Sequence, residues 1–182
     1  MVPYIDQEKL QPGTVNALFF HMMGSHGPAY AKRYPDKFNK WGPVCTNSDL
    51  RSCDPKSIRN AYDNSILYTD HVLSSMIDKL KAMKDADTAL IYMSDHGESL
   101  GEKGLFLHGA PYAIAPSEQT HIPMILWVSD GLRSRLGIAK GCLEACAKKP
   151  VSHDDLWSTV LALTQVKSST YNAKQDITAA CR

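Results

Sequence analysis

The sequence predicts an α/β fold in which helices cover a mainly parallel sheet. Three short apolar runs, residues 15–22, 88–93 and 122–128, have the length and composition of buried strands. A long segment between the first two runs repeats apolar residues at three- and four-residue steps, which is typical of a helix. Strands that alternate with helices favour a parallel sheet with helices packed on its faces.

The first expected strand, residues 15–22, follows a Pro-Gly pair and ends in the turn-rich sequence around His26, Gly27 and Pro28. An irregular excursion containing Cys45 and Cys53 comes next. The expected long helix then begins with Asp54 as its N-cap and a proline at the first helical position, and runs to about Met83.

The second half of the chain contains the two later strands and further helices. The strand at 88–93 leads into a glycine-rich segment that extends to Pro116, and the third strand follows at 122–128. Ser152 with Asp155 three residues later is an N-terminal capping signal, which predicts a helix after it. A short helix within 139–148 is also expected.

Composition and charge exclude several classes of protein. The chain has 182 residues, of which 43% are apolar and 21% charged, as is ordinary for a globular domain. A net charge of +1 argues against nucleic acid as a partner, because such binding needs many phosphate-neutralising contacts. No apolar run approaches the ~20 residues of a membrane span, and the first residues do not resemble a signal peptide.

The five cysteines leave two interpretations open. Cys45 and Cys53 flank a polar loop, so they could form a small disulfide in an oxidising compartment or remain two unpaired thiols. No C-x-x-C spacing is present, which argues against a zinc ribbon. The odd count leaves at least one cysteine without a partner in this chain.

Candidate site residues gather where the expected strands end. Asp95, His96 and Glu98 directly follow the strand at 88–93, and His108 follows later in the same glycine-rich segment. His26 follows the first expected strand. Sites in doubly wound sheets form beyond the carboxyl ends of the strands, so we expect these loops to lie at one edge. Carboxylate and imidazole ligands suit zinc, and an oxygen-rich set would also admit manganese.

Taken singly, each of these residues has a plainer explanation. Asp95 could be a helix N-cap, Glu98 a solvated loop carboxylate, and each histidine an ordinary hydrogen-bonded or loop residue. Their convergence from independent strand-end loops favours a site. The remaining histidines lack such neighbours and are interpreted as structural or surface residues; they are His21, His71, His121 and His153.

The run Ser94-Asp95-His96-Gly97-Glu98-Ser99-Leu100-Gly101-Glu102, followed by Leu107-His108-Gly109, Pro111-Tyr112-Ala113-Ile114-Ala115-Pro116, Gln119 and Ile122-Pro123, resembles one family. This family is the lipid A phosphoethanolamine transferases, which include the mobile colistin-resistance enzymes. The likeness also covers Met23–Pro28, Arg33–Pro35, Cys45 to Cys53, Tyr62–Ser65 and Cys181-Arg182. Asp-His-Gly alone is shared with the wider alkaline phosphatase and sulfatase superfamily.

The resemblance implies an alkaline-phosphatase/sulfatase-like fold, of which residues 1–182 form the C-terminal portion of the catalytic domain. It implies transfer of phosphoethanolamine from phosphatidylethanolamine to the phosphates of lipid A, which confers polymyxin resistance. The complete enzyme is expected to use zinc, and to be anchored to the inner membrane of a Gram-negative cell with its catalytic domain on the periplasmic face.

The resemblance also assigns roles by matched position. Asp95 and His96 would be zinc ligands, whereas His26 and His108 would bind substrate phosphate or a second zinc. Glu98 would be a near neighbour of the site that contacts substrate. The resemblance further implies the Cys45–Cys53 disulfide. Two more cysteines, Cys142 and Cys181, also fall at family positions, and Cys146 is the extra one.

The departures from the family pattern predict an incomplete enzyme. The family's nucleophilic threonine, a glutamate zinc ligand and the membrane helices have no counterpart in this sequence. The isolated chain is therefore expected to be inactive, to bind zinc weakly and to need the missing part as a partner. A sulfatase is disfavoured because no C-x-P-x-R motif is present. A phosphoglycerol transferase, a phosphohydrolase and a non-catalytic truncated remnant remain as alternatives.

Overall fold

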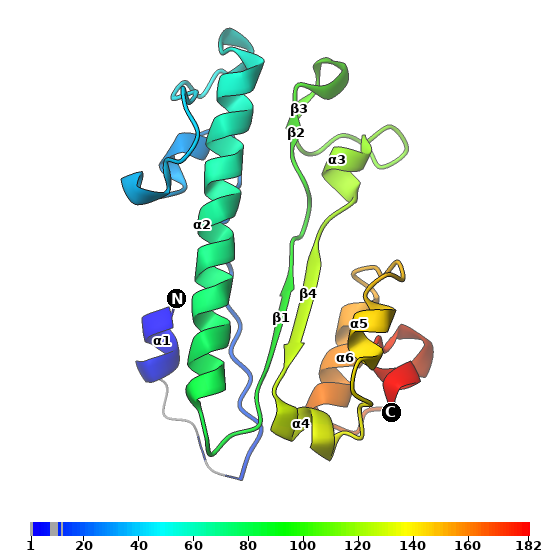
Figure 1. Cartoon of the computed structure of the whole chain (residues 1–182). Coiled ribbons are helices and arrows are strands. Elements are labelled where there is room, and N and C mark those ends of the chain that lie inside the picture. The colour runs from blue at the N-terminus through cyan, green and yellow to red at the C-terminus, as the bar shows by residue number, and fades with distance from the viewer. Residues whose placement is uncertain (1, 8–10, 12) are drawn as a thin grey trace. The chain divides into compact units, whose positions relative to one another are not determined.

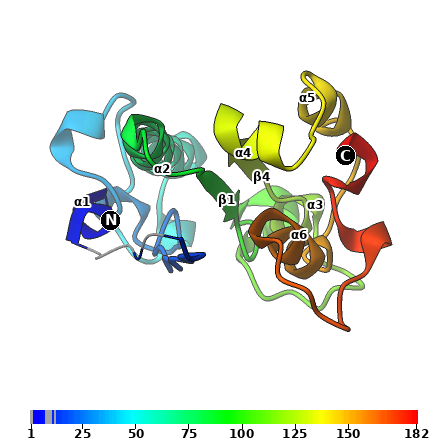
Figure 2. The ribbon, with the colours of Figure 1, turned by 90° about the horizontal axis from the view of Figure 1, so that it is seen from below.

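A computed structural model describes residues 2–7, 11 and 13–182. The described chain forms two compact units, each assembled from separate stretches of sequence. The first unit contains the N-terminal helix, Leu18–Lys79 and Ile91–Ile125, and the second contains Leu80–Leu90 and Leu126–Arg182 together with the described residues among 11–17. The path of the chain through both units can be followed in Figures 1 and 2.

The longest described element is helix α2, Pro55–Ala82, which belongs to the first unit as far as Lys79 and matches the predicted helix closely (Figure 1). Asp54 caps it as expected, because its Oδ1 accepts hydrogen bonds from the backbone N–H groups of Lys56 and Ser57. The unit also contains the short helices α1, Val2–Gln7, and α3, Ser117–Thr120. Short 3-10 turns cover Tyr30–Lys32, Asp36–Phe38, Leu50–Ser52 and Glu102–Gly104.

The irregular excursion before α2 is fixed to the helix by a core and by one asparagine. Tyr30, Cys45 and Leu50 pack against Ile58 and Ala61 of α2 in a buried cluster. Asn64, which is fully buried, accepts from the N–H groups of residues 40 and 41 and donates to the carbonyl of residue 41. This side chain replaces the backbone partners that an irregular loop lacks.

The described strands form two small sheets. Strand β1, Ala89–Met93, pairs with β4, Met124–Val128, and β2, Ser99–Leu100, pairs with β3, Phe106–Leu107. The predicted strands at 88–93 and 122–128 are thus confirmed within one or two residues. The β2–β3 hairpin is antiparallel, and it lies between β1 and β4 along the chain (Figure 1).

The predicted parallel direction is not found in these two sheets. Backbone hydrogen bonds join Ser129 to Thr88 at one end of the β1–β4 ladder and Ser94 to Pro123 at the other, so the two strands run in opposite directions. A parallel neighbour of β1 would have come from the first expected strand through a crossover by α2. That strand does not form among the described residues, and β1 instead pairs with the returning β4.

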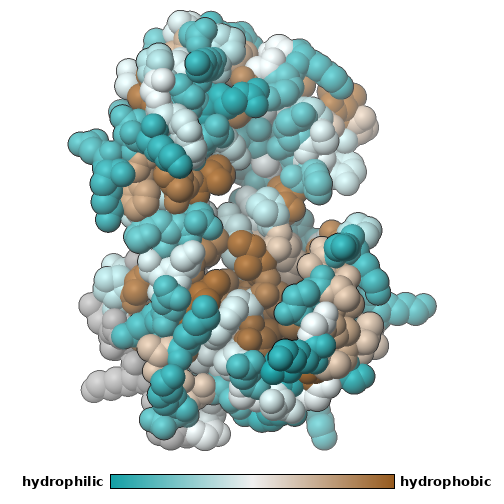
Figure 3. All heavy atoms as spheres, viewed as in Figure 1, coloured by the Kyte–Doolittle hydropathy of each residue, from teal (hydrophilic) through white to brown (hydrophobic). Residues whose placement is uncertain are grey.

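The prediction of a strand at residues 15–22 is wrong. These residues form no regular structure, and several of their side chains are open to solvent, with Phe19 86% and Val15 58% exposed. Apolar side chains also reach the surface elsewhere (Figure 3). A strand requires a neighbour for its backbone N–H and C=O groups, and no described strand pairs with this stretch.

The second unit contains three helices: α4, Asp130–Arg135, α5, Cys142–Cys146, and α6, Asp155–Thr164. Helix α5 confirms the short helix expected within 139–148. Helix α6 confirms the capping signal, because the N–H of Ser152 donates to Asp155 Oδ2. The C-terminal segment adds the 3-10 turns Ala173–Gln175 and Ala179–Cys181.

Two disulfides cross-link the described chain. Cys45 and Cys53 are joined in the first unit, as the resemblance implied. Cys142 and Cys181 are joined in the second unit, and Cys146 is the free cysteine. None of the helices among the described residues is both long and apolar enough to span a membrane.

Candidate metal centre

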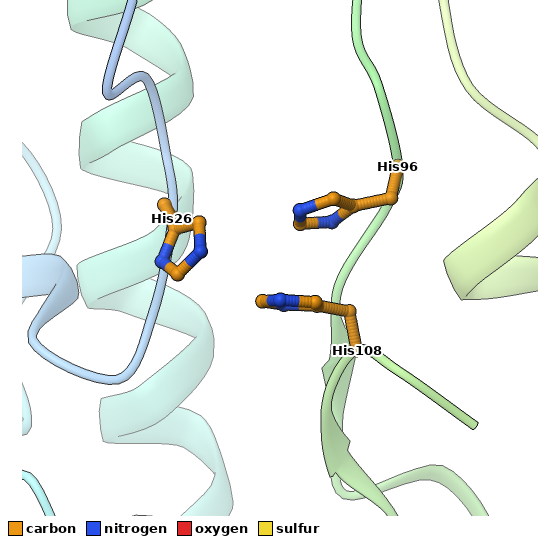
Figure 4. Close-up of side chains that lie close together, drawn as sticks. All are labelled: His26, His96 and His108. Carbon is orange, nitrogen blue, oxygen red and sulfur yellow. The ribbon is translucent and has the colours of Figure 1, made fainter.

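Three histidines of the first unit come together from three separate loops. His26 follows the irregular N-terminal stretch, His96 follows β1, and His108 follows β3. One ligand atom of each residue lies within 4.8 Å of those of the other two. The rings of His96 and His108 stack with their centroids 3.8 Å apart, and both face the ring of His26 (Figure 4).

The hydrogen bonds of the three rings leave the same nitrogen free on each. The Nδ1 atoms of His26 and His96 lie 2.7 Å and 3.0 Å from the carbonyl oxygens of Gly27 and Gly97. The Nδ1 of His108 lies 3.1 Å from Glu98 Oε1. A carbonyl or carboxylate oxygen only accepts, so each Nδ1 carries the proton and donates. The Nε2 lone pair of each neutral ring is then available to a ligand, as in metal-binding histidines.

Glu98 supports the histidine cluster through hydrogen bonds. Its side chain is buried, with the residue only 7% exposed, and its two oxygens accept hydrogen bonds from three donors. The donors are the Gly27 N–H at 3.1 Å, the Tyr30 hydroxyl at 2.8 Å and His108 Nδ1 at 3.1 Å. Glu98 is therefore not a solvated loop carboxylate, and it links the loop of His26 to the loop of His108.

Tyr30 was not identified by sequence reasoning, although it completes this support. The side chain is fully buried, and burial together with the nearby negative charge of Glu98 raises its pKa far above the ordinary value. The hydroxyl therefore stays protonated and donates to the carboxylate. A tyrosine within a short turn-forming sequence carries no signal that could have shown this role.

Asp95 lies at the rim of the cluster. Its carboxylate is 82% exposed and comes within 3.8 Å of His96 Nε2. Its other oxygen accepts from the backbone N–H of His96. No described helix begins at Asp95, which removes the alternative role as an N-cap. Its assignment as a metal ligand stays a prediction.

The loop that carries His96 is packed tightly against α3. Gly97 lies so close to the backbone of α3 that a Cβ atom at this position would be 2.0 Å from the carbonyl oxygen of Glu118. The Gly97 N–H donates to the carbonyl of Gln119, whose side chain in turn bonds Ser99 Oγ and the N–H of Ala110. Gln119 thus ties together the loops of His96 and His108.

The donor set fits a zinc ion. Zinc takes imidazole nitrogen and carboxylate oxygen at about 2.0–2.2 Å, which places ligands of a tetrahedral site about 3.3 Å apart. The ligand atoms of the three histidines lie within 4.8 Å of one another, and Asp95 Oδ2 lies 3.8 Å from His96 Nε2. Small side-chain movements would therefore bring these atoms to the separation that zinc requires. The four other histidines do not join this group; His71, for example, packs its ring against Phe38.

Comparison with known proteins agrees with this fold. The family model described as Sulfatase matches residues 1–166. The chain belongs to the sulfatase family. It is 43% identical over 167 residues to the phosphoethanolamine transferase EptA of Salmonella typhimurium, an alignment that covers 91% of this chain and 30% of that protein.

Solved structures give the same result. The integral membrane protein lipooligosaccharide phosphoethanolamine transferase A from Neisseria meningitidis is 46% identical, with a TM-score of 0.86 over 89% of this chain and 31% of that one. The C-terminal periplasmic domain of phosphoethanolamine transferase EptC from Campylobacter jejuni is 47% identical, with a TM-score of 0.78 over 86% of this chain and 49% of that one. The predicted sulfatase-like fold and the resemblance to phosphoethanolamine transferases are confirmed. The chain spans about a third of the length of the full-length relatives.

Proposed function

We propose that this chain forms part of a zinc-dependent enzyme that transfers phosphoethanolamine from phosphatidylethanolamine to the phosphate groups of lipid A. The observation that carries the proposal is the convergence of His26, His96 and His108 with their Nε2 atoms free. The relatives are phosphoethanolamine transferases, which supports phosphoethanolamine as the transferred group. The Neisseria relative is a lipooligosaccharide phosphoethanolamine transferase, which supports lipid A as the acceptor.

In this proposal Asp95 and His96 would hold zinc, which would supply positive charge beside the phosphate oxygens of the substrate and activate a hydroxyl nucleophile. His26 and His108 bind the phosphate oxygens of the substrate. Each does so with its Nε2 atom, which donates when the ring is protonated. Both rings contact the ring of His96, so they lie beside the proposed zinc ligand.

Glu98 positions His108 in this mechanism. Because the carboxylate accepts from Nδ1, it fixes the orientation and the tautomer of the His108 ring. The Gly27 N–H donates to the same carboxylate, so Glu98 connects the loop of His26 to the ring of His108. Glu98 acts through His108 and does not contact the substrate directly, because both of its oxygens already accept hydrogen bonds from protein donors.

The nucleophilic threonine and a further zinc ligand are contributed by parts of the complete protein outside these 182 residues. The complete protein is anchored to the inner membrane with this region on the periplasmic face. The Neisseria relative, an integral membrane protein, and the Campylobacter relative, a periplasmic domain, support this placement. The isolated chain is inactive in this proposal. We place polymyxin and colistin resistance among its consequences in the cell.

The test replaces Asp95 or His96 by Ala in the complete protein and measures phosphoethanolamine on lipid A by mass spectrometry. Each variant is expected to reduce the modification at least about 100-fold, since both alter the metal site directly. His121→Ala, an exposed histidine outside the cluster, is the matched control and keeps the modification. Unchanged modification in both variants would refute the ligand assignment, and phosphoglycerol in place of phosphoethanolamine would refute the transferred group.

A further inference from the structure

The second unit brings three sulfur atoms to one point. Cys142 and Cys146 lie one turn apart on α5, and both face Cys181 in the C-terminal turn, which lies beside α5 in Figures 1 and 2. Cys142 and Cys181 form the disulfide. The free Cys146 Sγ lies 3.7 Å from the Cys181 Sγ, which is the separation of two sulfur atoms in contact.

A thiol held against a disulfide is the arrangement that thiol–disulfide exchange requires. The reaction proceeds by attack of a thiolate on one sulfur of the bond, and its rate depends on access and on how well the reactants are positioned. Here no diffusion is needed, because the attacking and attacked sulfur atoms already touch. The other described disulfide, Cys45–Cys53, belongs to the first unit.

The residue under attack, Cys181, is held by contacts of its backbone and of its neighbour. Cys181 is 5% exposed, and its carbonyl oxygen accepts from the N–H of Ala139 at 2.9 Å. The next residue, Arg182, bonds the buried carboxylate of Asp176 and the hydroxyl of Tyr171. The backbone of Cys181 is therefore held in place, and its Sγ lies within 4.8 Å of both sulfur atoms of α5.

We propose that Cys142, Cys146 and Cys181 form an intramolecular thiol–disulfide exchange site. The Cys146 thiolate attacks Cys181 Sγ, the Cys146–Cys181 bond forms, and the Cys142–Cys181 bond breaks with its electron pair moving to Cys142 Sγ. The proton lost by Cys146 is regained by Cys142. No oxidant or reductant is consumed, since one thiol and one disulfide are present before and after the step.

The exchange moves the cross-link by one helical turn without releasing the C-terminus. Cys142 and Cys146 are four residues apart, which corresponds to about 6 Å along a helix. The C-terminal turn thus remains tied to α5 in both states, while the free thiol changes position. This inference is independent of the proposed transferase activity.

The experiment maps the free thiol of the intact protein. The protein is incubated at pH 8, where an ordinary thiol is partly ionised, and trapped with excess N-ethylmaleimide. Digestion with trypsin and a glutamate-specific protease separates Cys142 from Cys146, because Glu144 lies between them. Most chains are expected to carry the label on Cys146. About 0.1–10% are expected to carry it on Cys142, with an equal amount of the Cys146–Cys181 bridge.

Two variants complete the test. Cys142→Ser is expected to form the Cys146–Cys181 disulfide during air oxidation, whereas the control Cys146→Ser keeps the original bridge and takes no label. Label confined to Cys146 after prolonged incubation of the wild-type protein overturns the proposal, without any need for a variant to fold. Bridges from this group to Cys45 or Cys53 also overturn it, because they would show exchange through unfolded chains.

Discussion

At the scale of single residues, the candidate site depends on which atom of each histidine is already engaged. Gly27, Gly97 and Glu98 provide acceptors that hold the Nδ1 protons of the three rings. Any divalent metal or phosphate group approaching the cluster therefore meets Nε2 atoms. Two of these acceptors are backbone carbonyls, so their contribution does not depend on side-chain identity, whereas Glu98 depends on its own supporting donors.

The first prediction concerns the hydroxyl of Tyr30. Tyr30→Phe keeps the ring in the buried cluster but removes the donor to Glu98. A hydrogen bond to a charged group contributes about 1.5–3 kcal/mol, so the free energy of unfolding should fall by about this amount. Urea denaturation measures the change. Tyr112→Phe is the control, because Tyr112 is 87% exposed, and it should change the stability by less than about 0.5 kcal/mol.

The same substitution should lower the transferase activity of the complete protein as well. Glu98 positions His108, and loss of such outer support typically costs about 10–100-fold in activity or metal affinity. Stability and activity both equal to wild type would show that the Tyr30–Glu98 bond has no supporting role.

At the scale of elements, the site is held by the close contact between the loop after β1 and helix α3. Gly97 allows this contact because it lacks a side chain, and Gln119 binds both neighbouring loops. Neither the loop nor α3 is long enough to be stable alone. Their hydrogen bonds to each other therefore determine where His96 and His108 lie.

The second prediction follows from this contact. Gly97→Ala would place a methyl group 2.0 Å from the carbonyl oxygen of Glu118, and the backbone must move to relieve the overlap. We expect a loss of about 1–3 kcal/mol in stability. Because His96 precedes the displaced residue, we also expect a clear loss of activity in the complete protein. Thermal unfolding and the lipid A assay measure the two effects.

Gly42→Ala is the matched control for Gly97→Ala. A Cβ atom at Gly42 would meet no atom within 4 Å, so its substitution should leave the activity unchanged. If Gly97→Ala behaved like this control in both assays, the packing of this loop against α3 would not determine the position of His96.

At the scale of the whole molecule, this chain supplies only part of the proposed zinc-ligand set. Asp95 and His96 are the two zinc ligands that the proposal assigns to the described residues, while the proposed nucleophile and a further ligand lie outside them. Structural zinc sites use four ligands from the protein, and catalytic sites use three with an open position. The strength of zinc binding therefore reports how complete the site is.

The third prediction is that zinc binds the isolated chain more weakly than about 1 µM, whereas the complete protein binds it more tightly. Isothermal titration with zinc measures both constants, and His96→Ala should weaken binding in each protein. Submicromolar binding by the isolated 182 residues would show that the described ligands suffice.

Much of this organisation could be predicted from the sequence because local signals carried it. Asp54 at the start of α2 and Asp155 in α6 specify caps through their own side chains, and β1 and β4 are apolar runs of strand length. The sequence groups His26, His96 and His108 as residues of loops that follow expected strands. The structure brings the three together, although the strand expected before His26 does not form.

The remaining features depend on partners distant in the sequence. The stretch at 15–22 has the composition of a strand, yet no described strand pairs with it, and its local pattern could not reveal this. Tyr30 supports Glu98 across the fold, and its own neighbours in the sequence give no hint of that contact. The direction of β4 is likewise fixed by where the chain returns after α3.

Each of the two compact units is assembled from stretches that are separated in the sequence, and this limits the order in which the chain can fold. The first unit needs both Leu18–Lys79 and Ile91–Ile125, and the second unit needs the segment between them. Neither unit can be produced by simple truncation at one end. During synthesis, His26 emerges long before His108, and contacts between distant residues form slowly. The histidine cluster can therefore form only after the segment that carries His108 has been synthesised.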